Sequence, residues 1–515
     1  MKKYIFLAYA LIIGSVAFAQ TEYDALRMGQ TDIVGSARYM SMGGAFGALG
    51  GDASALKDNP AGLGVYRSGE VTATLNGMFQ SANADWEGAT SSSSSGFNVK
   101  FNNFTYVMSV PFWEERTTGL LHSNFSFSYN RVKNFNRVMR SNGGSESSFT
   151  DFLAGFTNGF TEQDLKYVEN SYDPYLERDI PWLSVLAYDG YLINNDPGTT
   201  NWFSALAAPN EVADARNIVN ESGGISEYSF GWGGNFNNNL FLGANINIAD
   251  LTYSLNSILT EDFNAGGYDL QNILNQSGLG VNLKLGAIYL PTNNVRLGLA
   301  FHTPTFYTIS EVGYAELTYE NLNESVNGST NVPSEGSRQN FNLMTPMQAQ
   351  LSAAYMFGRK GVISFEYNFV NYTGMRFSES EGGRDAFERE NEGMKEVLRN
   401  GHVIKVGGEY KPIESVALRA GYAMLTGATH PTYTEGKTLL ENGVNTNTEY
   451  FEQKGTNFIS FGVGYRQPFW YVDLSYALKM QNEDFYPYQF NRTELTASHI
   501  KSNTNNIALT VGFKM

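Results

Sequence analysis

The chain of 515 residues contains no cysteine, so a disulfide framework, a thiolate metal site and a cysteine nucleophile are all excluded. Common catalytic motifs are also missing. None of the five histidines begins a His-Glu-x-x-His motif, and the sequence has no Gly-x-Ser-x-Gly elbow, no phosphate-binding loop and no EF-hand spacing. We therefore expect no enzyme, no metal site and no cofactor. A Ser/His pair on facing strands would leave no such signature, so a barrel hydrolase stays an alternative.

Long apolar runs are scarce as well. Lys2 and Lys3 precede an apolar stretch over residues 4–18, and Ala17-Phe18-Ala19 supplies small residues before a cleavage site. This pattern predicts a signal peptide over residues 1–19 and a mature chain that begins at Gln20. No later run reaches the roughly eighteen apolar residues of a membrane-spanning helix. If the protein crosses a membrane, it must do so as a β-barrel.

Positive charge is in short supply, with 35 Lys and Arg against 51 Asp and Glu and a net charge of −16. Nucleic-acid binding depends on clustered Lys and Arg, so we expect no nucleic-acid partner. Tyrosine, phenylalanine and glycine are plentiful, at 31, 35 and 53 residues. The composition is that of an exported β protein.

After residue 69, polar and apolar residues alternate in segments that predict fourteen strands. Short and long connections alternate between them, and the longest is residues 134–224. Both ends fall on the short-turn side, which is periplasmic in bacterial outer-membrane barrels. The predicted fold is all-β, a 14-stranded antiparallel, multi-pass transmembrane β-barrel over residues 67–515 in a Gram-negative outer membrane. The predicted strands cover residues 70–79, 99–112, 119–133, 225–236, 240–253, 278–290, 295–310, 340–356, 362–375, 400–411, 416–427, 455–467, 470–482 and 503–514.

Five of these strands have one face without charge. Val281, Leu283 and Leu285 show the pattern, and Lys284 lies between them. A Lys or Arg that faces the middle of a bilayer costs roughly 2–4 kcal/mol, whereas a polar lumen tolerates it. We therefore expect the apolar faces to contact lipid. The alternative is a soluble β-sandwich or propeller with these faces as its core.

The segment before the strands is rich in turn signals. Gly43-Gly44, Gly50-Gly51 and Asn59-Pro60 punctuate a stretch with few charges, which predicts a compact set of turns. Any helix over residues 52–58 should end by Asn59, because proline disfavours the α conformation in the residue before it. We expect residues 20–66 to form a plug inside the barrel.

Three motifs in the plug support a family resemblance: Met40-Ser41-Met42-Gly43-Gly44-Ala45-Phe46, Asp52-Ala53-Ser54-Ala55 and Asn59-Pro60-Ala61-Gly62-Leu63. In this order they resemble the N-terminal hatch of the outer-membrane long-chain fatty-acid transporter (FadL-type) family. Phe301-His302-Thr303-Pro304, Leu343-Met344-Thr345-Pro346 and Leu418-Arg419-Ala420-Gly421-Tyr422 resemble its strand patterns. The prolines also mark strand ends or bulges, because they donate no N–H.

The resemblance implies a porin-like channel for passive uptake of hydrophobic small molecules, such as long-chain fatty acids. The plug would be its gate, through Gly43, Gly44, Asp52, Asn59, Pro60 and Ala61. The family also has a side opening at a kinked third strand. Residues 120–142 contain neither Gly nor Pro that would explain a kink, so the sequence does not decide between lateral and periplasmic exit. The expanded connection 134–224 is a second departure from the family pattern.

Candidate ligand residues lie in that connection and in the lumen. Phe149, Phe152, Phe156 and Phe160 recur at helical spacing, and Trp182 follows. They form either the core of the loop or an apolar surface that receives a water-insoluble ligand. Lys284, Arg419 and Arg466 are candidate partners for a ligand carboxylate. Alternatively, these cations pair with lumen acids, for which the candidates are Glu366, Glu409 and Asp473.

The sequence thus predicts a monomeric uptake channel whose partners are outer-membrane lipid and a hydrophobic small molecule. The alternative is a surface receptor or scaffold that binds haem, a protein or a glycan, because a fold alone does not choose between such functions. A continuous apolar cavity between the loop and the plug would favour transport. A lumen packed with polar pairs would favour anchoring.

Overall fold

The computed structural model describes residues 20–111, 118–145, 148–177, 179–209, 211–333, 338–380, 387–430, 444–488 and 495–515. The predicted signal peptide, residues 1–19, lies outside the described residues. In the described part of the chain, no helix has the length and apolar character needed to cross a membrane.

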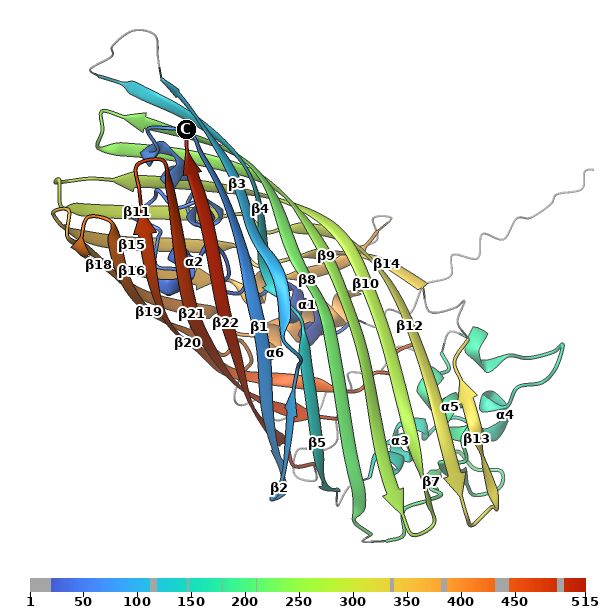
Figure 1. Cartoon of the computed structure of the whole chain (residues 1–515). Helices are drawn as coiled ribbons and strands as arrows, with labels where there is room; N and C mark the ends of the chain where they lie inside the picture. The colour runs from blue at the N-terminus through green and yellow to red at the C-terminus, as the bar shows by residue number, and fades with distance from the viewer. Residues whose placement is uncertain are drawn as a thin grey trace, which may run out of the picture.

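The chain forms a closed antiparallel barrel of fourteen strands, as predicted (Figure 1). Five of the fourteen strands consist of two or three consecutive segments. In chain order the strands are β1 (Glu70–Trp86), β2 (Ala89–Ser94) with β3 (Asn98–Pro111), β4 (Leu120–Asn134) with β5 (Arg137–Ser145), β8 (Ala213–Phe236), β9 (Leu240–Phe263), β10 (Gly266–Tyr289), β11 (Val295–His302) with β12 (Phe306–Asn321), β13 (Val326–Asn331) with β14 (Arg338–Met344) and β15 (Gln348–Phe357), β16 (Gly361–Val370) with β17 (Arg376–Glu379), β18 (Gly401–Ile413), β19 (Val416–Thr426), β20 (Tyr450–Arg466), β21 (Trp470–Tyr486) and β22 (Ser498–Lys514). The barrel closes because β1 pairs with β22, from Glu70 opposite Lys514 to Asp85 opposite His499.

Three strands are much longer than the sequence indicated. β8, β9 and β10 each have 24 residues, and the predicted long connection 254–277 is wrong, because β9 and β10 meet in a tight turn after Phe263. The reason lies in the polarity of β9. In its first half, Ile246 and Ile248 face outward, whereas in its second half Leu251, Tyr253 and Leu255 are buried inside. The apolar face therefore changes sides where the barrel extends beyond the apolar band.

The outward face of the barrel is apolar, as expected. Val281, Phe365 and Leu474 are 53%, 47% and 45% exposed, whereas the intervening Glu366 and Asp473 are fully buried in the lumen. Such a surface is stable in contact with lipid, and the polar side chains find partners inside.

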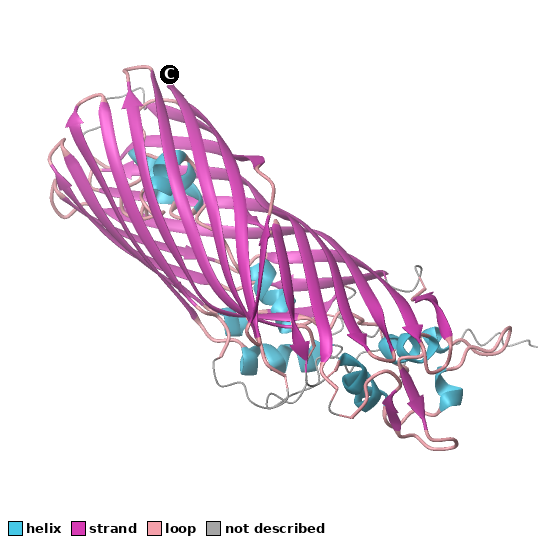
Figure 2. Ribbon diagram, turned by 60° about the horizontal axis from the view of Figure 1, so that its bottom comes forward, coloured by secondary structure: helices cyan, strands magenta, loops and turns pink. Residues whose placement is uncertain are grey.

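Residues 20–66, the plug, lie inside this barrel (Figure 2). The plug contains α1 (Glu22–Gly29), α2 (Ala37–Ser41) and the 3₁₀ turns η1 (Ser54–Lys57) and η2 (Pro60–Val65). Hydrogen bonds link it to strands on several sides: Ala37 N to Thr510 Oγ1 at 2.7 Å, Gly47 N to Glu366 Oε2 at 2.8 Å, and Asn245 Nδ2 to Leu56 O at 2.7 Å. The turn η1 ends before Asn59, as the following proline predicted.

The third strand is interrupted, although residues 120–142 contain neither Gly nor Pro. β4 ends at Asn134, β5 begins at Arg137, and the register against β8 shifts between Arg131 and Lys133. The cause lies in the neighbouring strand. Gly223 of β8 has φ +107° and contacts the break through its backbone, since Phe135 N donates to Gly223 O at 3.3 Å. Gly223 lies across the sheet from the break, so the sequence around the break gives no sign of it.

Prolines interrupt two further strands, as their lack of an N–H predicted. Pro304 separates β11 from β12, and Pro346 separates β14 from β15. The 3₁₀ turn η4 (Tyr372–Gly374) separates β16 from β17.

A compact group of short elements follows β5. It comprises α3 (Phe149–Thr157), α4 (Glu162–Leu165), η3 (Pro174–Leu176), α5 (Trp182–Asp189), β6 (Ile193–Asn195) and β7 (Trp202–Ser204). These elements lie beside the extended ends of β10, β12 and β13, at the end of the barrel opposite the C-terminus (Figure 1). A last helix, α6 (Glu388–Val397), packs against α1 of the plug.

Candidate functional site

A cavity lies in the lumen between α1, the long strands and the segment that leads into β20. Its empty volume is about 1500 Å³, part of which is open to solvent. Residues from distant parts of the chain line it, among them Leu26 of the plug, Phe135 at the third-strand break and Trp182 of α5. The cavity therefore adjoins the plug, the loop elements and the interrupted wall.

Helix α1 is fixed at both ends. At its start the Thr21 hydroxyl accepts a hydrogen bond from Asp24 N, and Asp24 Oδ2 accepts one from Thr21 N at 3.0 Å, which is a capping box. At its end Gly29 lies close to the wall, since an added Cβ would lie 2.7 Å from Met375 Sδ and 2.9 Å from Pro346 Cδ. Tyr23 and Leu26 of this helix line the cavity.

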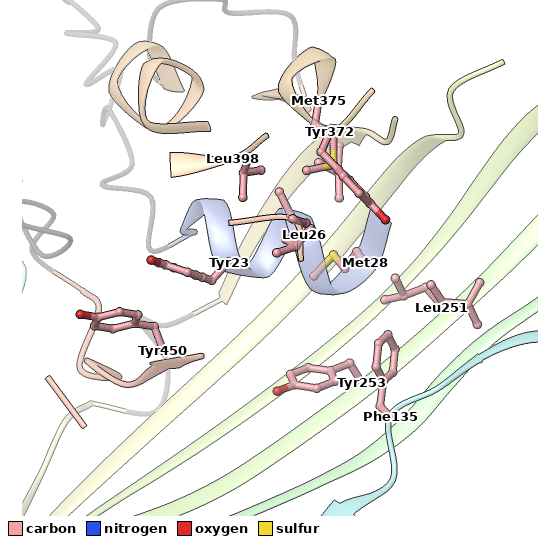
Figure 3. Packing of buried hydrophobic residues seen from close by; sticks show 14 of the residues in the cluster. Tyr23, Leu26, Met28, Phe135, Leu251, Tyr253, Tyr372, Met375, Leu398 and Tyr450 are labelled. Atoms are coloured by element: carbon pink, nitrogen blue, oxygen red, sulfur yellow. The ribbon is translucent and has the colours of Figure 1, made fainter. Parts of the chain in front are cut away.

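One side of the cavity is aromatic. The rings of Phe135 and Tyr253 meet edge to face, with centroids 5.2 Å apart, and those of Tyr23 and Tyr450 lie 5.0 Å apart. Figure 3 shows both pairs around α1, with Leu251 beside Phe135. These side chains provide an apolar surface from the plug and the wall together.

The other side carries ion pairs. Arg137 binds two carboxylates, with Nε 2.5 Å from Glu221 Oε2 and Nη1 2.8 Å from Glu483 Oε2. Arg27 of α1 pairs with Asp24 and lies 3.8 Å from Glu221. The plug helix thus joins a network that runs from β8 to β21.

A plug residue, Asp32, completes the hydrogen bonding of β4 at the interrupted strand. Asp32 N donates to Val132 O at 2.8 Å, and Asp32 Oδ2 accepts from Asn134 N at 3.1 Å. Lys479 donates to its other oxygen at 2.7 Å, and Lys133 lies 3.8 Å away. Burial alone would raise the pKa of Asp32, but these two lysines hold it well below its usual range.

The contact of Asp32 with β4 takes the place of strand pairing, because the barrel wall opens between β3 and β4. Pairing between β3 and β4 runs from Pro111 opposite His122 to Asn103 opposite Asn130, and within the described residues it goes no further. Beyond that point β4 faces the plug instead of a strand. The wall closes again further along, where Ser93 Oγ donates to Val138 O at 3.1 Å.

The expected gate residues lie deeper in the plug, away from the lining of the cavity. Asn59 caps η2 through Ala61 N at 3.0 Å and donates to Gly47 O at 2.6 Å, which positions Pro60 and Ala61. Asp52 accepts from the Ser36 hydroxyl at 2.9 Å.

Of the two glycines of the expected gate, Gly43 meets the wall and Gly44 packs inside the plug. Gly43 and Gly44 adopt φ values of +62° and +73°, and Gly43 N donates to Ser460 Oγ at 3.2 Å. At Gly43 the plug backbone therefore comes close to β19 and β20. A Cβ there would lie 3.0 Å from Tyr422 N and would obstruct this approach.

The aromatic candidates of the long connection gather in one cluster. Phe152 and Trp182 are buried in it, and Phe156 and Phe160 pack against it, together with Phe149 and residues of β9, β10 and β12. Trp182 also lines the cavity, whereas the four phenylalanines do not. The cluster forms the core of the loop elements and joins the cavity through Trp182.

The cationic candidates are engaged by other side chains. Lys284 Nζ lies 2.6 Å from Glu227 Oε2. Arg419 bridges Glu409 and Asp473 at 2.7 and 2.6 Å, deep in the lumen. Arg466 lies over the Tyr471 ring at 4.6 Å. None of the three cations lines the large cavity.

Sequence reasoning missed the cations that do line it. Helix α1, which carries Arg27, could have been predicted, because Thr21-x-x-Asp24 followed by apolar residues is a capping-box signature. Arg137, by contrast, fell in a segment predicted to be a loop. Its role follows from the pairing of β5 with β8, which sets it opposite Glu221.

No metal site accompanies the cavity. Among the described residues, no group of three or more His, Asp or Glu side chains could hold a metal ion.

Comparison with known proteins identifies the fold. No protein-family model matches the sequence, and no curated protein matches it. Solved structures do match over almost their whole length. The toluene transporter TodX of P. putida is 15% identical, with 95% of this chain and 99% of that chain covered and a TM-score of 0.51. A FadL homologue from Pseudomonas aeruginosa is 13% identical, with 94% and 99% covered and a TM-score of 0.52. The chain therefore has the fold of these FadL-type barrels, as the plug motifs predicted.

Proposed function

We propose that this protein is an outer-membrane channel for the passive uptake of hydrophobic small molecules. The observation that carries the proposal is the cavity that joins Trp182 of the loop elements, Leu26 of the plug and Phe135 at the interrupted strand. A molecule bound there would contact the loop elements, helix α1 of the plug and the interrupted wall at once. The likeness to a toluene transporter of P. putida supports the same conclusion.

In this proposal a ligand enters from the loop side, rests in the cavity and leaves when the plug shifts. The plug moves only if the ligand binds its two positions with different affinity. The gate consists of the turns at Asp52 and Asn59-Pro60-Ala61 and the Gly43-Gly44 pair. The exit is the opening between β3 and β4. The protein acts as a monomer, with residues 1–19 removed and both termini in the periplasm.

Cavity blockage tests the proposal. Gly313 lines the cavity, and an added Cβ there would meet only Leu274 Cδ1, at 3.9 Å. We expect Gly313→Trp to reduce uptake of radiolabelled toluene by about tenfold, because the indole fills the passage. The host is a Gram-negative strain without its own hydrophobic-compound channels.

Gly155→Trp is the matched control, because Gly155 lies in α3 with nothing within 4 Å of an added Cβ and does not line the cavity. The proposal is wrong if the wild-type protein gives no uptake above the empty host, or if both variants transport equally. A receptor that only anchors loops would give the first result. The open cavity supports transport over that alternative.

A further inference from the structure

The charges around the cavity are balanced by the protein itself. Four basic side chains line it, Arg27, Lys133, Arg137 and Lys479, and five acidic ones, Asp24, Glu221, Glu311, Glu449 and Glu483. Each base has an acidic partner among the described residues. Arg27 pairs with Asp24, Arg137 with Glu221 and Glu483, and both lysines with Asp32.

The faces of the two guanidinium groups are covered as well. Arg27 lies over the Tyr253 ring, 4.3 Å from its centroid, and Arg137 lies over the Phe451 ring at 3.8 Å. Nη1 of Arg27 has no hydrogen-bond partner among the described residues, but it is inaccessible to solvent. Both the ion pairs and the ring contacts therefore engage the two guanidinium groups before any ligand binds.

A carboxylate ligand would have to break one of these buried pairs. Removing one partner of a buried pair leaves the other charge uncompensated, which is strongly unfavourable. The cavity already disfavours an ionised carboxyl at Glu449, whose pKa burial raises to about 8 with added repulsion from Glu221. A further negative charge would meet the same penalty without a free cation to offset it.

We propose that this cavity selects uncharged apolar molecules and discriminates against carboxylates. The proposal rests on the uptake function and names the class of ligand. The apolar part of the ligand would lie against the aromatic residues that line the cavity, Phe135, Tyr253 and Tyr450. Lys284 and Arg419, which the sequence suggested as carboxylate partners, lie outside this cavity.

A matched pair of probes tests the proposal on the purified full-length barrel in detergent. Naphthol and naphthoate share one ring system, but at neutral pH only naphthoate is charged. We expect naphthol to bind at least about tenfold more tightly, since naphthoate finds no unpaired cation. Equal or tighter binding of naphthoate overturns the charge selectivity and leaves the uptake function standing. Failure of both probes to bind overturns the uptake function as well.

A specificity switch provides the second measurement. Glu483→Gln removes one of the two carboxylates that hold Arg137, so we expect naphthoate affinity to rise by about tenfold and naphthol affinity to stay within about twofold. Glu409→Gln is the matched control, because Glu409 binds Arg38 and Arg419 away from the cavity. The wild-type comparison decides the question alone if Glu483→Gln does not fold. An unchanged ratio in a folded Glu483→Gln variant contradicts the proposal.

Discussion

The carboxylate of Asp32 in the plug accepts a hydrogen bond from the backbone N–H of Asn134 in β4, 3.1 Å away. The same residue donates its own N–H to Val132 O at 2.8 Å. A plug residue therefore takes the place of a strand where β4 loses its pairing with β3. In the proposed function, this contact would couple movement of the plug to exposure of the wall opening.

Asp32→Ala should loosen the edge of β4. Hydrogen bonds to charged groups contribute about 1.5–3 kcal/mol, so we expect amide exchange at Asn134 to accelerate by about tenfold or more. Hydrogen exchange with mass spectrometry measures this effect. Asp32→Asn keeps an acceptor without the charge and should give an intermediate rate. Unchanged protection in the alanine variant would show that the plug does not hold this edge.

Gly223→Ala should destabilise the barrel at the break. Gly223 has φ +107°, and an added Cβ would lie 2.2 Å from Thr252 O, so the alanine is strained in both respects. We expect a loss of about 1–3 kcal/mol in the free energy of unfolding, read from denaturant titration of the refolded barrel. Gly313→Ala, with open space and no positive φ, is the control. Equal stability of the two variants would remove Gly223 as the cause of the break.

The seating of α1 should depend on pH. Burial raises the pKa of Glu22 to about 7, and Asp24 of α1 with Glu390 and Glu396 of α6 adds repulsion. Because this pKa lies above the ordinary value of 4.5, the folded state favours the protonated carboxyl of Glu22. The contribution of Glu22 to the stability of the folded state is complete below about pH 4.5 and is lost as the pH rises through 7.

We therefore expect faster amide exchange in α1 at pH 8 than at pH 5, after correction for the intrinsic rate. The Glu22→Gln variant keeps the shape of the side chain without its charge and serves as the control. It should show no such difference. A pH dependence that persists in this variant would assign the effect to another group.

Two ion pairs should differ sharply in their contribution. Lys284→Ala leaves Glu227 buried without its partner and should cost about 3–5 kcal/mol in unfolding free energy. Arg216→Ala removes a pair whose side chains are 50% and 51% exposed, and should cost about 0–1 kcal/mol. Denaturant titration compares the two. Adding Glu227→Gln to Lys284→Ala should recover part of the loss, and a similar cost for both single variants would contradict this account.

The sequence determined the architecture because alternation is a local property. Each residue of a strand points to the opposite side from its neighbour, so Lys284 between Leu283 and Leu285 was enough to assign lipid and lumen faces. The turns around Gly43-Gly44 and Asn59-Pro60 were equally local. The polarity of β9 reverses after Ile248, where the barrel extends beyond the apolar band. The same alternation predicted the wrong end for this strand, because it was interpreted as if the whole strand lay in the apolar band.

Only the tertiary structure decided the site. Arg27, Arg137 and Glu483 lie in the plug, the third strand and the thirteenth, and no spacing in the sequence relates them. The break in the third strand likewise depends on Gly223 across the sheet. Pairing partners are set by which strands become neighbours when the barrel closes, and that information lies in contacts between residues hundreds of positions apart.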